Sequence, residues 1–141
     1  MPSRIAIDAY RFRTGMLLCV GVVLGCGCRG DTTPATYSVR GKILYKSTQR
    51  PLTQGSVLFQ SLSEPRVQAS GDIQSDGSFD LASDVGKPGT VAGEHQVMIQ
   101  PPVLEAGQKP IVHKRFTSYS TSGLKATVQA KSTNELVLEV D

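Results

Sequence analysis

Residues 36–46 read TYSVRGKILYK, and this stretch decides the fold because its apolar or small residues occupy every second position. The residues at these positions are Tyr37, Val39, Gly41, Ile43 and Tyr45. A period of two places side chains on one face of an extended chain. The stretch therefore predicts a β-strand with one buried face.

The same period recurs at the other end of the chain, in LKATVQA (124–130) and in ELVLEV (135–140). In the second run, Leu136, Leu138 and Val140 alternate with Glu135, Val137 and Glu139. The polar residues 131–134 lie between the two runs. Two alternating runs joined by a short polar segment predict a terminal hairpin.

The middle of the chain contains shorter strand signals. Val57 and Phe59 lie in one of them, residues 67–74 form another, and HQVMIQ (95–100) ends at two prolines. The Asp76-Gly77 pair predicts a type I′ turn and hence a hairpin that continues through residues 79–81. Together the runs predict about seven strands with no helical segment of useful length, which is typical of an antiparallel sandwich.

The N-terminal residues have the pattern of an export signal. Arg4, Arg11 and Arg13 precede an uncharged run at positions 14–24, and small residues follow it. A basic region, a short apolar run and a small-residue cleavage site are typical of a secretory signal. The run is too short to span a bilayer, which takes roughly 20 apolar residues.

Removal of residues 1–25 changes the charge balance of the chain. The whole sequence has 15 Lys plus Arg and 12 Asp plus Glu, and the signal contains three arginines and Asp8, which leaves 12 against 11. No basic cluster alternates with aromatic residues, so we expect no nucleic-acid partner. The remaining length is that of one domain with a single modest core.

Two resemblances to known proteins extend this interpretation. Val23-Leu24-Gly25-Cys26 resembles the lipobox of bacterial lipoproteins, in which the cysteine is lipidated and becomes the mature N-terminus. The resemblance implies a signal peptide at 1–25, a lipidated N-terminus and flexible tether at 26–36, and a membrane anchor on Cys26. Cys28 is a competing lipidation position, and a plain secretory signal is the alternative. Two acyl chains are enough for stable anchoring.

The second resemblance covers residues 39–140. It is carried by VRGKI (39–43), RPLTQGSVLF (50–59), DGSF (76–79), GKPGT (86–90) and TSGL (121–124). In order and spacing these motifs resemble the carboxypeptidase-regulatory-like or transthyretin-like domains of small bacterial lipoproteins. The resemblance implies a Greek-key, transthyretin-like or Ig-like sandwich at 37–141. Relatives of this kind serve as accessory, stabilising or binding modules.

The sequence contains no residue pattern that predicts a catalytic or metal site. Asp72, Asp76, Asp80 and Asp84 recur at every fourth position, but apolar residues lie opposite them, which predicts a solvent-exposed face rather than a calcium site. His113 is expected in a solvated loop and His95 at a strand edge or the surface. We therefore expect no catalytic residue, no metal and no cofactor.

The candidate ligand-binding segment is 101–122, because it is longer than ordinary hairpin connections. Its candidate contact residues are Lys114, Arg115, Phe116 and Tyr119. The family resemblance implies instead that an aromatic residue just before TSGL packs as part of the fold, so we favour core or edge packing of Phe116 and Tyr119 over ligand contact.

These observations predict an exported, non-enzymatic lipoprotein of the cell envelope, anchored on the periplasmic or outer side of a membrane. We expect it to act as a structural or protein-binding module with an envelope protein or polymer as partner. The alternative is a soluble or surface module that binds carbohydrate or peptide through the 101–122 loop.

Overall fold

The alternating residues of the opening stretch form strand β1 (Ser38–Tyr45), and its inward side chains Val39 and Ile43 are 2% and 0% exposed. The computed structural model of the chain describes residues 33–141. The predicted signal segment and both candidate lipidation sites, Cys26 and Cys28, lie outside the described residues.

Seven further strands and two short helices follow β1 along the chain. They are β2 (Ser56–Ser61), β3 (Gln68–Asp72), β4 (Ser78–Asp80), β5 (Ala82–Ser83), β6 (Gly93–Gln100), the 3-10 helix η1 (Lys114–Thr117), the α-helical turn α1 (Tyr119–Ser122), β7 (Leu124–Val128) and β8 (Thr133–Val140).

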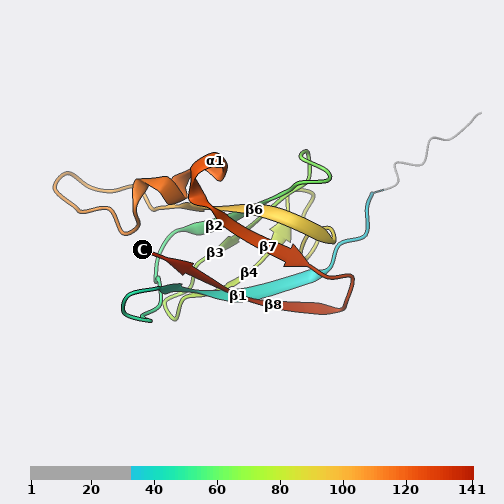
Figure 1. Cartoon of the computed structure of the whole chain (residues 1–141), viewed down its shortest axis with the longest axis horizontal. Coiled ribbons are helices and arrows are strands. Elements are labelled where there is room, and N and C mark those ends of the chain that lie inside the picture. The colour runs from blue at the N-terminus through green and yellow to red at the C-terminus, as the bar shows by residue number, and fades with distance from the viewer. Residues whose placement is uncertain (1–32) are drawn as a thin grey trace, which may run out of the picture. The chain divides into compact units, whose positions relative to one another are not determined.

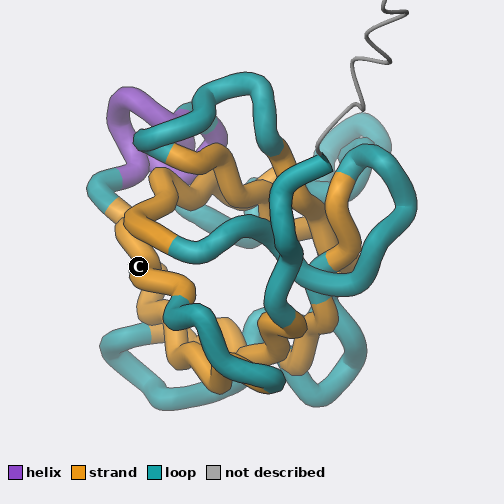
Figure 2. The backbone as a smooth tube through the Cα atoms, turned by 90° about the vertical axis from the view of Figure 1, so that its right-hand side faces the viewer, coloured by secondary structure: helices purple, strands orange, loops and turns teal. Residues whose placement is uncertain are grey.

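The strands form two sheets that pack as a sandwich (Figure 1). One sheet has three strands in the order β4-β1-β8, and the other has five in the order β5-β3-β2-β6-β7. The predicted β-sandwich is therefore confirmed, with eight strands in place of about seven. Figure 2 shows the two short helices together at one corner of the domain.

The core lies between the two sheets and is built from the inward positions of the alternating runs. Phe59 of β2 and Phe79 of β4 come from opposite sheets, and their ring centroids lie 6.1 Å apart. Full burial of one such side chain contributes about 1.5–3 kcal/mol relative to exposure. The buried strand residues around this pair are Val39, Ile43, Val57, Ala69, Val97, Ile99, Ala126, Val128, Leu138 and Val140.

The prediction of a wholly antiparallel sandwich is wrong, because β1 and β8 pair in parallel. Their register runs over eight residue pairs, from Ser38 opposite Thr133 to Tyr45 opposite Val140. Parallel neighbours need a long connection between them. Here the whole intervening domain supplies that connection.

The predicted terminal hairpin of β7 and β8 is wrong. β7 pairs with β6 in the five-stranded sheet, and β8 pairs with β1 in the other sheet. Residues 129–132 therefore cross between the sheets. The Asn134 side chain holds this crossing, because its Oδ1 accepts from the Gln129 N–H at 2.8 Å and its Nδ2 donates to the Gln129 carbonyl at 3.0 Å.

The turn at Asp76-Gly77 is present, but it is not the predicted type I′ turn. Only Gly77 has a positive φ, of 80°, whereas a type I′ turn requires positive φ at both central residues. The Gly77 N–H donates to the Gln74 carbonyl, and the Gln74 N–H donates to Ser78, as in a three-residue loop. The flanking strands β3 and β4 then diverge into different sheets.

The prediction that His95 lies at an edge or the surface is also wrong. Its side chain is 0% exposed, near the start of β6 and on the face of the strand that points into the core. It fits there because both ring nitrogens have partners: Nε2 lies 3.2 Å from the Thr90 hydroxyl and Nδ1 lies 3.0 Å from the Gly93 carbonyl. A buried polar group that is fully hydrogen-bonded avoids most of the desolvation cost.

None of the helices within residues 33–141 is long and apolar enough to cross a bilayer.

Candidate binding surfaces

The outer face of the three-stranded sheet gathers charged side chains from all three of its strands. Arg40 of β1 lies between Asp80 of β4 and Glu135 of β8 in the strand register. Its Nε lies 3.4 Å from Asp80 Oδ1, and both side chains are largely exposed. An exposed pair of this kind contributes only about 0–1 kcal/mol to stability.

The next positions along the same face are more apolar toward β8. Lys42 of β1 lies opposite Ser78 of β4 and Val137 of β8. Val137 is 66% exposed, which makes it one of the large apolar side chains on the surface of the described residues. Glu139 follows on β8 and accepts a hydrogen bond from Gln49 Nε2 at 3.1 Å.

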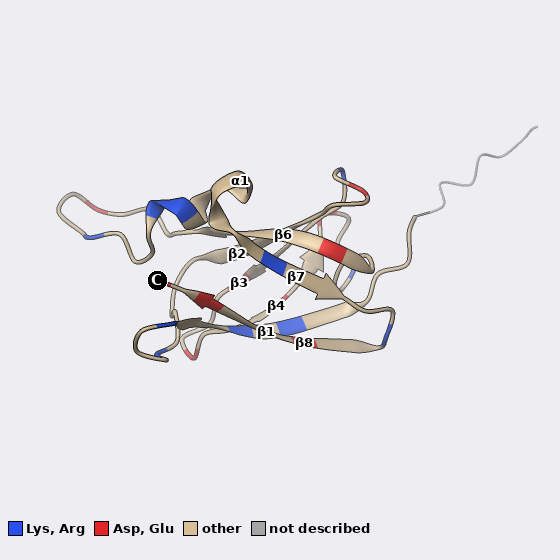
Figure 3. Cartoon of the chain, viewed as in Figure 1, with Lys and Arg blue, Asp and Glu red and all other residues tan. Residues whose placement is uncertain are grey.

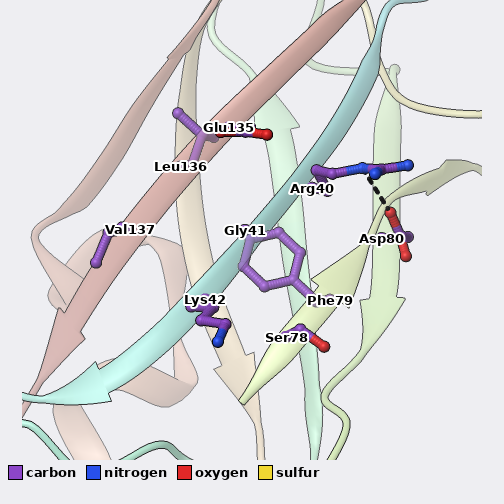
Figure 4. Close-up of a pocket in the computed structure, with 9 residues that line it drawn as sticks. All are labelled: Arg40, Gly41, Lys42, Ser78, Phe79, Asp80, Glu135, Leu136 and Val137. Carbon is purple, nitrogen blue, oxygen red and sulfur yellow. Dashed lines mark ion pairs between the residues drawn. The ribbon is translucent and has the colours of Figure 1, made fainter. Parts of the chain in front are cut away.

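Residues of all three strands, among them Arg40, Asp80 and Val137, border an open groove of about 680 Å³ at the centre of the sheet (Figure 4). Gly41 lies at the middle of the groove, and the Phe79 ring lies beside it. A Cβ at position 41 would come within 2.7 Å of Phe79 Cζ and closer still to the Leu136 carbonyl oxygen. Gly41 is therefore required for the close approach of β4 and β8 to β1.

The four aspartates at every fourth position are exposed, as predicted. Asp76 accepts hydrogen bonds from the hydroxyl and the N–H of Ser78, and these hydrogen bonds hold the pKa of its carboxyl below the usual value. Asp72 accepts from the Ser56 hydroxyl at 2.8 Å, and Asp80 pairs with Arg40. Within residues 33–141 no three His, Cys, Asp or Glu side chains converge as a metal site would require.

The segment 101–122 folds into η1 and α1 after an irregular stretch. Figure 3 shows that part of η1 is basic, and its two basic residues are Lys114 and Arg115. Arg115 pairs with Asp141 at the C-terminus and stacks over the Phe116 ring, with its Cζ 4.5 Å from the centroid. His113 is exposed, as predicted, and its Nδ1 accepts a hydrogen bond from the Arg115 N–H at 3.2 Å.

The two aromatic residues of this segment pack into the fold. Phe116 is 1% exposed and belongs to the core, which confirms the packing implied by the resemblance. Tyr119 is half-buried, and its hydroxyl is buried without a hydrogen-bond partner among the described residues. Burial raises the pKa of this hydroxyl.

The exposed side of the same segment forms a shallow depression of about 430 Å³. Its lining residues are His113, Lys114, Arg115, Thr117, Ser118 and Thr121. The structure thus brings together Lys114 and Arg115 of the predicted set and directs Phe116 into the core. Ligand binding by this segment stays a prediction.

The sequence analysis missed the outer face of the three-stranded sheet. The signal was present in the outward residues of β8, where Val137 lies between Glu135 and Glu139. The alternating pattern predicts only that these residues lie on the solvent side of a hairpin strand. Their position beside Arg40 and Lys42 depends on the parallel pairing of β1 and β8, which the sequence did not indicate.

No protein-family model matches the chain, and no curated protein matches it. The chain is similar in structure to BcpA, the major pilin subunit of Bacillus cereus, with a TM-score of 0.47 and 11% identity over 77% of this chain and 30% of the pilin. A variant of the same pilin gives a TM-score of 0.46 and 9% identity over the same shares. The chain therefore spans less than a third of the length of these pilin chains. Its fold is assigned from the pairing of its own strands.

Proposed function

We propose that this chain is an exported, lipid-anchored and non-enzymatic module of the cell envelope that acts as a structural or protein-binding domain. The observation that carries the proposal is the order of parts along the chain. A signal-like segment ends before Cys26, a polar stretch follows to position 36, and the β-sandwich then begins with β1. The strand that follows the proposed tether, β1, is the middle strand of its sheet.

A non-enzymatic role is supported by the local partners of the exposed carboxylates. Asp76 is hydrogen-bonded within its own turn, Asp72 binds Ser56, and Asp80 pairs with Arg40. Each of these groups has a structural role in the turn or sheet that carries it.

The experiment that tests the anchor is intact-mass analysis of the full chain purified from the membrane fraction of its native host. We expect the mature chain to begin at Cys26 and to carry the mass of a diacylglyceryl group on that residue. Cys26→Ser is expected to abolish the lipid mass, whereas the matched variant Cys28→Ser keeps it. Lipid on Cys28, or a mature chain without lipid, would contradict the proposal, and the second result would favour a plain secretory signal.

A second candidate function is carbohydrate or peptide binding through the 101–122 segment. It is favoured by the depression that the exposed residues Lys114 and Arg115 help to line, although the Arg115 guanidinium is already paired with Asp141. Titration of the protein with anionic fragments of envelope polymers tests it. Binding that Lys114→Ala weakens severalfold, and that Lys125→Ala leaves unchanged, would support this candidate.

A further inference from the structure

The free edge of β8 is the longest open sheet edge in the described part of the chain. The two sheets have four edge strands, of which β4 has three residues, β5 two, β7 five and β8 eight. β8 pairs only with β1 among residues 33–141. An open edge presents unpaired N–H and C=O groups that can pair with another chain.

The register identifies which backbone groups face outward. The Lys46 N–H donates to the Val140 carbonyl, so Val140 directs its backbone polar groups toward β1. Successive residues of an extended strand alternate in this respect. The N–H and C=O groups of Glu135, Val137 and Glu139 therefore face the open edge.

The side chains of the same three residues lie on the outer face of the sheet and are exposed. Arg40, the basic neighbour of Glu135 in the register, pairs with Asp80 on its other side. The edge thus presents two carboxylates separated by one apolar side chain, at alternate positions.

We infer that the β8 edge binds an extended protein segment by strand addition, and that this segment has basic, apolar and basic residues at alternate positions. The inference rests on the proposed protein-binding function and specifies its site. On an added strand, two basic side chains lie opposite Glu135 and Glu139, and the apolar one lies opposite Val137. Main-chain hydrogen bonds supply affinity, and the alternate side chains supply specificity.

Charge complementarity distinguishes this occupant from a second copy of the chain. In a two-fold antiparallel pair of β8 strands centred on Val137, Glu135 of one copy lies opposite Glu139 of the other. Like charges directly opposite each other are unfavourable. A basic partner strand converts both positions into favourable pairs.

The test measures binding of the full chain, purified in detergent, to two fluorescent peptides by anisotropy. One peptide has the sequence TRTVTRT and the other TETVTET. We expect the wild-type chain to bind the basic peptide about tenfold more tightly than the acidic one. The double variant Glu135→Lys, Glu139→Lys is expected to reverse this preference, and because both side chains are exposed it should keep the fold.

A matched control separates the edge from general electrostatics. The double variant Asp72→Lys, Glu94→Lys makes the same change in net charge on exposed positions of the five-stranded sheet. We expect it to keep the preference for the basic peptide. Equal changes in both double variants would overturn the inference.

Amide hydrogen exchange gives a second, residue-resolved readout. Bound peptide is expected to slow exchange at Glu135, Val137 and Glu139, whose N–H groups face the open edge. Leu136 and Leu138, already paired with β1, should change little. Absence of peptide binding, self-association through β8, or protection at residues 113–121 would each overturn the inference. The last result would keep a binding function but move it to the other surface, and lipid analysis at Cys26 is independent of all three.

Discussion

His95 shows at the scale of one residue how a polar side chain becomes part of the core. Since the Gly93 carbonyl only accepts, Nδ1 carries the proton and the Thr90 hydroxyl donates to Nε2. The Phe59 ring lies 6.0 Å away, centroid to centroid. Burial is the largest effect on this imidazole and lowers its pKa below the ordinary value.

This lowered pKa predicts a loss of stability in mild acid. Above about pH 6.5 the imidazole is neutral in both the folded and the unfolded chain, so it adds no pH dependence. Below that pH the unfolded chain takes up a proton that the folded chain does not, and the free energy of unfolding falls by at most about 1.4 kcal/mol per pH unit. Urea unfolding between pH 5 and 8 measures this slope.

His95→Gln is expected to flatten that slope, and His113→Gln, at an exposed position, serves as the matched control. An unchanged slope in the His95 variant would show that another group controls the acid response. Sequence alone did not predict the burial of His95, because a histidine at the start of an alternating run reads equally well as an edge residue. Its partner Thr90 lies outside that run.

At the scale of elements, the alternating runs predicted the strands but not their partners. The pattern of β8 assigns Leu138 and Val140 to the core, and both are buried. It contains no information on whether β7 or β1 lies beside them. Partner choice depends on contacts between residues about 95 positions apart, such as Ser38 with Thr133, and a local pattern does not record those contacts.

The short helical element η1 was not predicted, because its four residues give no measurable helical period. Phe116 fixes it to the domain, with a side chain 1% exposed among the core residues. The exposed residues of the element, Lys114 and Arg115, remain on the solvent side. The resemblance predicted the packing of Phe116, whereas the helical geometry came only from the structure.

We therefore expect Phe116→Ala to lower the free energy of unfolding by about 3–5 kcal/mol, because it removes a buried aromatic side chain and leaves a cavity. Lys114→Ala, two residues away and exposed, should change it by less than about 0.5 kcal/mol. Urea unfolding of the two variants at neutral pH gives the comparison. Similar small effects in both would mean that η1 detaches without cost to the sandwich.

At the scale of the whole molecule, the sandwich joins the first and last strands of the domain side by side. β1 follows the proposed tether and lies at the centre of its sheet, while β8 ends one residue before the end of the chain. The sequence predicted the two sheets and the burial of one face of each. The surface that we propose for binding became visible only when this pairing placed β8 at an open edge.

The parallel pairing of β1 and β8 also determines how the domain responds to mechanical load. Ser38 lies beside Thr133 and Tyr45 beside Val140, so tension between the N-terminal tether and Asp141 pulls the two strands past each other along their common axis. The hydrogen bonds of the ladder then resist the pull together, in shear, instead of opening one after another like a zipper. For a domain held by the lipid anchor that we propose, the same pairing that closes the fold would act as a mechanical clamp.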